Sequence, residues 1–145
     1  MAVTKKFTAG LKFNTNNVFP NAVSISETMT VTVDGDAATS GSIKVTSSNH
    51  IAVCTADPSA GDDGDGLDSG ARAFVFVKNV GTNDDGDIEI EDNANARIAH
   101  LKSGEWAFLP FMHSSSADAS VKVSGASATA GYAEYVVIET TTTDY

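Results

Sequence analysis

The sequence predicts an all-β protein, built as a single β-sandwich or jelly-roll domain of about eight or nine strands that spans residues 1–145. Apolar and polar residues alternate with the two-residue period of half-buried strands from one end of the chain to the other. No segment of about ten or more residues has the period of a helix. Turn-forming residues separate the alternating segments, so short strands follow one another along the chain.

The clearest strand lies in the N-terminal part of the chain, at Val23–Val33. Its odd-numbered residues, apolar except for Glu27, share one face, while serines and threonines fill most of the other. This pattern predicts a long strand with one solvated side. Turn-like residues follow, and Ile43 and Val45 then resume the alternation, so we expect them on the hairpin partner of this strand.

The segment before that strand is predicted to be an N-terminal arm over residues 1–20. Phe7, Leu11 and Phe13 stand too far apart in a polar segment to define a strand. An apolar side chain in such a segment needs a pocket on another surface. These three residues are therefore the candidate interface residues of the chain.

The middle of the chain predicts three further strands and an acidic loop. Ile51–Thr55 is a short strand, and Ala73–Val77 is apolar on both faces, as expected of an inner strand. In Asp87–Glu91 acids alternate with isoleucines, which predicts that the carboxylates point outward. The glycine-rich segment 56–71 is an acidic surface loop, and Gly81–Gly86 is expected to join the second and third of these strands as a hairpin loop.

The segment Leu101–Phe111 combines a turn, the only tryptophan and a proline. Gly104 supplies the backbone freedom that a tight turn over residues 102–105 requires. In the strand that follows, Trp106 and Phe108 oppose three other apolar residues, so both faces are expected to be buried between two layers. Pro110 has no amide proton and predicts a strand end or an edge position. Strands over 96–101, 120–124 and 132–139 complete the fold.

The composition indicates one soluble domain. At 145 residues and 15.0 kDa the chain can bury a core without disulfides, and its single cysteine, Cys54, lies in an apolar run that predicts a buried thiol. No apolar run approaches the roughly 20 residues of a membrane helix, and the N-terminus has no apolar secretory region. We therefore expect an intracellular protein without a membrane partner. The net charge of −10 predicts that it does not bind nucleic acid.

Neither acidic loop has the residue spacing of a helix-flanked calcium site. In the first, Asp63 and Asp65 alternate, but Leu67 stands where a third oxygen ligand is needed. In the second, Asn83, Asp85 and Asp87 alternate, but Ile88 replaces the required glycine. Solvated loops are the preferred interpretation, and cation binding by residues 57–70 stays open.

No set of residues predicts catalysis. His50, His100 and His113 have no neighbours at a zinc-ligand spacing. Ser114–Ser116, next to His113, lie in an expected loop rather than at the strand-to-helix turn of a serine nucleophile. We therefore assign no catalytic, metal-binding or cofactor-binding residue, and we expect no cofactor and no enzymatic activity.

The C-terminal half contains an ordered series of short motifs. Val-Lys-Asn ends at residue 79, an acidic turn and Ile-Glu-Ile at 88–90 follow, then Leu-Lys-Ser-Gly-Glu-Trp-Ala-Phe-Leu-Pro at 101–110, and finally Glu-Tyr at 134–135. This series resembles small β-rich virion proteins of tailed bacteriophages. The resemblance implies a structural subunit located in the virion, either a capsid decoration or cement protein or, as the alternative, a tail, baseplate or head-fibre component.

The resemblance also implies partners within the particle. They are the major capsid protein or other virion subunits, and further copies of the chain itself, for example in a homotrimer. In this hypothesis edge strands, the N-terminal arm and the C-terminal tail lie across joints between coat subunits, with Phe7, Leu11 and Phe13 as anchors. The acidic surface would meet basic coat patches. Deleting Met1–Asn14 should then abolish attachment and leave the melting behaviour of the fold unchanged.

A carbohydrate-binding or receptor-binding module is the alternative from another functional class. Trp106, Tyr132 and Tyr135 have faces apolar enough to cover a sugar ring, and this function requires one of them to be exposed on a concave face. Packing in the core or in a subunit contact is the preferred role of Trp106, because its neighbours in the strand are core-like. Binding to a glycan array would distinguish the two classes.

Overall fold

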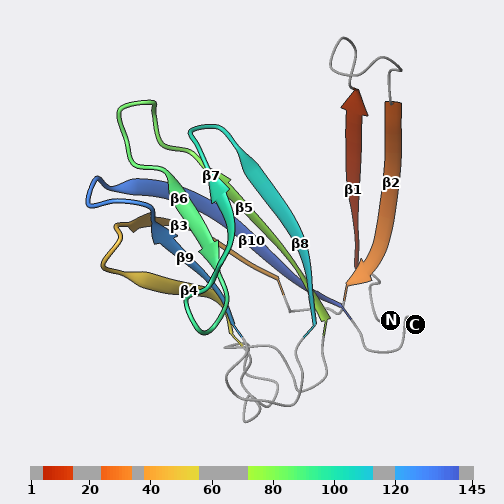
Figure 1. The fold of residues 1–145 in the computed structure, drawn as a ribbon. Coiled ribbons are helices and arrows are strands. Elements are labelled where there is room, and N and C mark those ends of the chain that lie inside the picture. Colours follow the sequence, from red (N-terminus) through yellow and green to blue (C-terminus); the bar gives the residue numbers. More distant parts are fainter. Residues whose placement is uncertain (1–4, 15–23, 34–37, 56–71, 113–119, 141–145) are drawn as a thin grey trace. The chain divides into compact units, whose positions relative to one another are not determined.

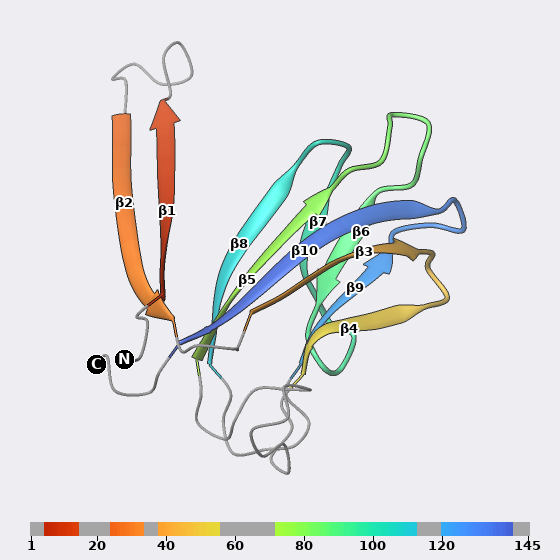
Figure 2. The same cartoon turned by 180° about the vertical axis from the view of Figure 1, so that it is seen from behind.

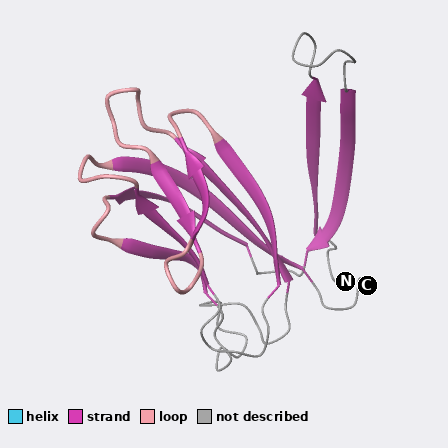
Figure 3. Ribbon diagram, viewed as in Figure 1, coloured by secondary structure: helices cyan, strands magenta, loops and turns pink. Residues whose placement is uncertain are grey.

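The computed structural model describes residues 5–14, 24–33, 38–55, 72–112 and 120–140, and these ranges contain strands, turns and loops without a helix (Figures 1 and 3). The predicted all-β class is confirmed, with more strands than the sequence indicated. The described ranges contain ten strands, which are β1 Lys5–Asn14, β2 Ser24–Val33, β3 Ala38–Val45, β4 His50–Thr55, β5 Arg72–Asn79, β6 Ile88–Glu91, β7 Arg97–Leu101, β8 Trp106–Met112, β9 Ser120–Gly125 and β10 Gly131–Thr140.

The chain divides into two compact units, residues 1–35 and 36–145. In the first unit β1 pairs antiparallel with β2 along its whole length, from Lys5 opposite Val33 to Asn14 opposite Ser24. The sequence predicted that β2 pairs with β3, the strand that contains Ile43 and Val45, and this prediction is therefore wrong. The alternation in β1 was hidden because Ala9, a small residue, stands between the larger apolar residues on the same face.

The second unit is a sandwich of two four-stranded sheets with the strand orders β3-β10-β5-β8 and β4-β9-β6-β7 (Figures 1 and 2). The neighbours nest from the ends of this unit inward, since β3 pairs with β10, β4 with β9, β5 with β8 and β6 with β7. This nesting is the connectivity of a jelly roll. Because β5 and β6 belong to different sheets, the loop Gly81–Gly86 crosses from one sheet to the other, and the hairpin predicted there is wrong.

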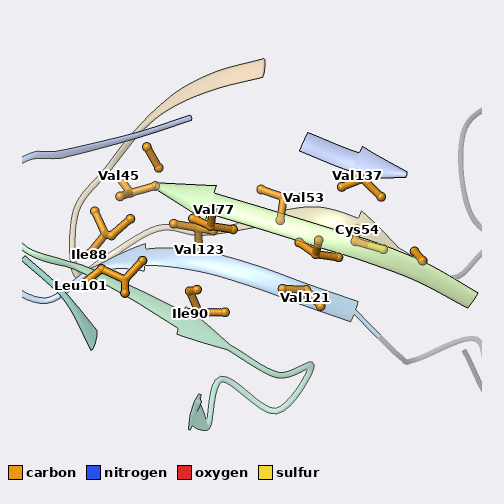
Figure 4. Close-up of a cluster of buried hydrophobic side chains, with 13 residues drawn as sticks. Val45, Val53, Cys54, Val77, Ile88, Ile90, Leu101, Val121, Val123 and Val137 are labelled. Carbon is orange, nitrogen blue, oxygen red and sulfur yellow. The ribbon is translucent and has the colours of Figure 1, made fainter. Parts of the chain in front are cut away.

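The core of the sandwich lies between the inner faces of its two sheets (Figure 4). Cys54 is buried among these side chains, as its apolar neighbours predicted. Burial of one valine or isoleucine side chain contributes roughly 1.5–3 kcal/mol, so this cluster holds the two sheets together. Its buried members are Val45, Val53, Cys54, Ala73, Val75, Val77, Ile88, Ile90, Leu101, Val121, Val123, Ala133 and Val137.

The turn predicted at residues 102–105 is confirmed. Gly104 has a φ of 80°, a conformation that a Cβ atom resists. The amide of Glu105 donates to the carbonyl of Lys102 at 2.9 Å, and a Glu105 carboxylate oxygen accepts from the amide of Lys102 at 2.8 Å. β8 begins directly after this turn and is an edge strand of its sheet, which agrees with the edge position expected from Pro110.

Candidate interaction surfaces

The β1–β2 hairpin, called the arm below, has one apolar and one polar face. Residues directly opposite each other in an antiparallel pair point to the same side, and the register pairs the odd-numbered residues of β1 with those of β2. On the apolar face, Leu11 is 49% and Ile25 is 39% exposed. Thr8 and Thr30 lie on the polar face, with their hydroxyl oxygens 3.3 Å apart. The arm thus offers a two-stranded apolar surface for packing.

The structure places the three candidate interface residues on β1. Leu11 is exposed on the apolar face, whereas the side chains of Phe7 and Phe13 lie outside the described part of the chain. Sequence reasoning missed Ile25, which pairs with Phe13 across the hairpin. The sequence did indicate that Ile25 lies on the apolar face of its strand. It did not show that this face joins that of β1, because this depends on the register between β1 and β2.

The outer face of sheet β3-β10-β5-β8 carries a second surface, called the aromatic face below and formed by Lys44, Phe76, Lys78, Trp106, Tyr132 and Glu134. Trp106 is 50% and Tyr132 is 37% exposed. The ring centroids of Phe76 and Trp106 are 6.1 Å apart, and the ammonium group of Lys44 lies 5.8 Å from the centroid of the Tyr132 ring. In the register, Lys78 stands opposite both Trp106 and Glu134. Aromatic rings and charged groups are thus mixed on one side of the sheet.

The exposure of Trp106 corrects the prediction that both faces of β8 are buried between two layers. Ala107, Leu109 and Phe111 pack against the core, but Trp106 points to the opposite side and is half exposed. Packing of Trp106 in the core of the sandwich is therefore excluded. Half-buried Phe108 lies on the outer side with it, stacked at 5.4 Å on the ring of Phe74. A subunit contact of Trp106 stays a prediction.

The outer face of the other sheet, called the ionic face below, carries charge pairs instead of aromatic rings. The acids of β6 alternate with the core residues Ile88 and Ile90, as predicted, but Glu89 and Glu91 are buried rather than solvated. Glu91 contacts His50 Nδ1 at 2.6 Å, and Glu89 forms an ion pair with Arg97. Side chains from β4 and β7 therefore cover these two carboxylates, and the alternation in the sequence did not indicate this burial.

His100 joins β7 to the acids of β6 on this ionic face. Its Nε2 lies 2.9 Å from a carboxylate oxygen of Asp87, and its Nδ1 lies 3.4 Å from one of Glu89. The hydrogen bond to Asp87, and after it the contact with Glu89, raises the pKa of His100 above its ordinary value, although desolvation acts in the opposite direction. The imidazole is therefore held more strongly in its charged form than a free histidine.

Asp85, one of the alternating oxygen-bearing residues of the second acidic loop, has a structural role in that loop. Asp85 accepts hydrogen bonds from the amide and the hydroxyl of Thr82 at 2.7 and 2.9 Å, so its carboxylate stabilises the turn. Among the described residues, no group of three or more His, Cys, Asp or Glu side chains is arranged to hold a metal ion. The acidic loop 57–70, His113 and Ser114–Ser116 lie outside this part of the chain. The same ranges contain no helix suited to crossing a membrane.

Two of the motifs behind the phage resemblance contact each other. Asn79, the last residue of Val-Lys-Asn, donates from Nδ2 to the carbonyl of Leu101 at 3.0 Å, and its amide donates to the carbonyl of Glu105 at 2.9 Å. A third motif residue, Tyr135, lies so close to Gly41 that a Cβ atom there would be 2.8 Å from its hydroxyl. These residue types are therefore explained by the architecture of the sandwich.

Comparisons with known proteins leave the family open. No protein-family model and no curated protein matches the chain. A similar solved structure is the SGBP-B protein of the Bacteroides ovatus mixed-linkage glucan utilization locus, in complex with a mixed-linkage heptasaccharide, with 14% sequence identity and a TM-score of 0.30. The alignment covers 94% of this chain and 37% of that chain, so this chain spans well under half of that protein. A likeness at this TM-score carries no functional conclusion.

Proposed function

We propose that the protein is a structural subunit of a bacteriophage virion, of the capsid decoration or cement type, that contacts neighbouring subunits through its arm. The observation that carries this proposal is the exposure of Leu11 and Ile25 on the apolar face of the arm. A two-stranded hairpin alone is at best marginally stable in water. Packing of its apolar face on another protein therefore stabilises the arm and attaches the chain at the same time.

The rest of the chain supports a structural role. His50 contacts the carboxylate of Glu91 and His100 contacts that of Asp87, so these pairs connect strands of one sheet. The motif series from Val-Lys-Asn to Glu-Tyr resembles phage virion proteins. Jelly rolls occur in viral capsid domains and also in lectins, so the fold is compatible with this function but does not select it.

In this proposal the protein is located in the virion and has no enzymatic activity. Its partners are the major capsid protein or other virion subunits, together with further copies of itself, and a homotrimer is one such arrangement. A tail, baseplate or head-fibre position is the alternative location for the same arm-mediated contact.

Binding to coat particles that lack this chain tests the proposal. Aspartate at Leu11 or Ile25 places a charge on the apolar face of the arm, and Thr8→Asp places the same charge on its polar face as a matched control. We expect Leu11→Asp and Ile25→Asp to weaken co-sedimentation by about tenfold or more and Thr8→Asp to leave it nearly unchanged. These variants are preferable to deletion of Met1–Asn14, which also removes the pairing partner of β2. Equal occupancy for all variants would contradict the proposed role.

Glycan binding on the aromatic face is the second candidate function. The exposed faces of Trp106 and Tyr132 can stack on sugar rings, and Lys78 and Glu134 between them can bind hydroxyl groups. A glycan array probed with the wild type and with Trp106→Ala tests this function, with Ile98→Ala as a control for loss of an exposed apolar side chain. Binding that only Trp106→Ala removes supports the candidate, and absence of binding to any glycan eliminates it.

A further inference from the structure

We propose that the arm of one copy packs its apolar face on the aromatic face of a second copy of the chain. This inference rests on the proposed function, because it names the neighbouring subunit that the arm contacts. In this inference the arm binds another copy of the same chain. The proposed function requires only that the arm contact some subunit of the particle.

The two surfaces contain most of the large apolar side chains exposed in the described ranges. These side chains are Leu11 and Ile25 on the arm, Trp106 and Tyr132 on the aromatic face, and Val80 and Ile98 elsewhere. Two β-sheets that pack face to face lie about 10 Å apart and bury the residues of their facing sides. Stacking the arm on the aromatic face would therefore remove the exposed apolar side chains of both surfaces from water in one contact.

The two units of the chain carry net charges of opposite sign. The first 35 residues carry three lysines against Glu27 and Asp34, a net charge of +1, so that the chain total of −10 leaves −11 on residues 36–145. Opposite net charges favour the encounter of an arm with the sandwich of another copy. Locally, Glu27 pairs with Leu11 on the apolar face of the arm, and the aromatic face offers Lys44 and Lys78 to receive it. The aromatic face also carries Glu134, so Glu27 of the arm would meet a face with two bases and one acid.

The contact also accounts for the sequence of β8. The inner side of this strand packs in the core, while the outer side carries Trp106 and is apolar without being part of that core. The arm of a second copy supplies the second layer that a strand with two apolar faces requires.

Self-association of the isolated full-length protein tests the inference, measured by sedimentation equilibrium over a range of concentrations. We expect the wild type to associate, and we expect Leu11→Asp and Trp106→Ala to raise the dissociation constant by about tenfold or more. Thr8→Asp on the polar face of the arm and Ile98→Ala on β7 are the matched controls and should leave it unchanged. Association that persists in Leu11→Asp and Trp106→Ala overturns the inference.

Cross-linking identifies which copy receives the arm. A Leu11→Cys protein is mixed with a differently tagged Trp106→Cys protein and treated with a short bismaleimide; the native thiol, Cys54, is buried in the core. We expect a heterodimer that carries both tags. A double variant that carries both Leu11→Cys and Trp106→Cys is treated in the same way. If it is cross-linked only within one chain, and the mixture of single variants gives no heterodimer, the arm packs on its own sandwich and the inference is wrong.

The two proposals fail in different ways. If the wild type is monomeric at all concentrations and Leu11→Asp still loses attachment to coat particles, the arm binds the coat, so this inference is overturned and the proposed function stands. If Leu11→Asp weakens self-association but not attachment, the inference stands and the arm does not mediate attachment to the coat. If Leu11→Asp changes neither property, both proposals are wrong.

Discussion

The side chain of Asn79 donates a hydrogen bond from Nδ2 to the carbonyl oxygen of Leu101 at 3.0 Å, and its Oδ1 accepts one from the amide of Gly81 at 2.9 Å. Asn79 ends β5 and Leu101 ends β7, and these strands belong to different sheets. The carbonyl of Asn79 also accepts from the amide of Gly104 at 2.9 Å, in the turn before β8. One buried residue thus connects the two sheets and fixes the turn that leads back from one to the other.

Asn79→Ala should destabilise the sandwich by about 1–3 kcal/mol, because it leaves the buried carbonyl of Leu101 and the amide of Gly81 without their partner. Urea unfolding, followed by tryptophan fluorescence, measures the change. The matched control is Asn83→Ala, since Asn83 is exposed in the loop that follows β5. Equal stabilities of the two variants would show that the bonds of Asn79 contribute little.

Ile88→Ala should lower the free energy of unfolding by about 2–5 kcal/mol, because it opens a cavity between the sheets at a fully buried position. The same substitution at Ile98 on neighbouring β7, where the side chain is 53% exposed, should change it by no more than about 0.5 kcal/mol. Thermal melting of both variants measures the difference. A similar loss at both positions would contradict the assignment of the core to one side of these strands.

Gly41→Ala should destabilise the protein by about 1–3 kcal/mol, because the new Cβ atom would lie 2.8 Å from the hydroxyl oxygen of Tyr135 and 2.9 Å from its ring. Combination with Tyr135→Leu should reduce this cost, since the smaller side chain vacates the space. A double-mutant cycle in urea unfolding measures the coupling. Additive effects would mean that Tyr135 moves away from Gly41 without cost.

Local patterns in the sequence predicted most of the strands and the turn at 102–105, but they did not predict β1. The alternation of apolar and polar residues placed the strand that became β2, and Lys-Ser-Gly-Glu predicted the turn at 102–105 because Gly104 adopts a positive φ. The pairing of the strands could not be predicted in the same way. β2 pairs with β1 instead of β3, and the loop Gly81–Gly86 crosses between the sheets instead of closing a hairpin. Strand pairing depends on which faces meet in the core, and a local pattern does not contain this information.

The two outer faces of the sandwich show the other limit of sequence reasoning. The alternation in β6 placed the acids on the outer side, but their burial depends on His50 and Arg97, which arrive from other strands of the sheet. Both sides of β8 are apolar. This pattern did not distinguish a strand that is buried on both faces from one whose outer face is partly exposed, as at Trp106. Of the arm, Leu11 could be identified as an interface candidate, but Ile25 required the register of the hairpin.

The ion pairs of His100 should make part of the stability depend on pH. The pKa of His100 is raised in the folded state by Asp87 and Glu89, so its contribution is fully present below the ordinary value of 6.5 and is lost as the pH rises through the folded value. Arg97, paired with Glu89, opposes this effect by its own charge.

His100→Gln should therefore lower the free energy of unfolding the most at about pH 5.5 and little at about pH 8.5. The contribution stays within about 1 kcal/mol, because the imidazole is partly exposed and solvent screens the pairs. Urea unfolding of the wild type and His100→Gln at both pH values measures the two differences, and a larger cost at the higher pH would contradict the charged state assigned to His100.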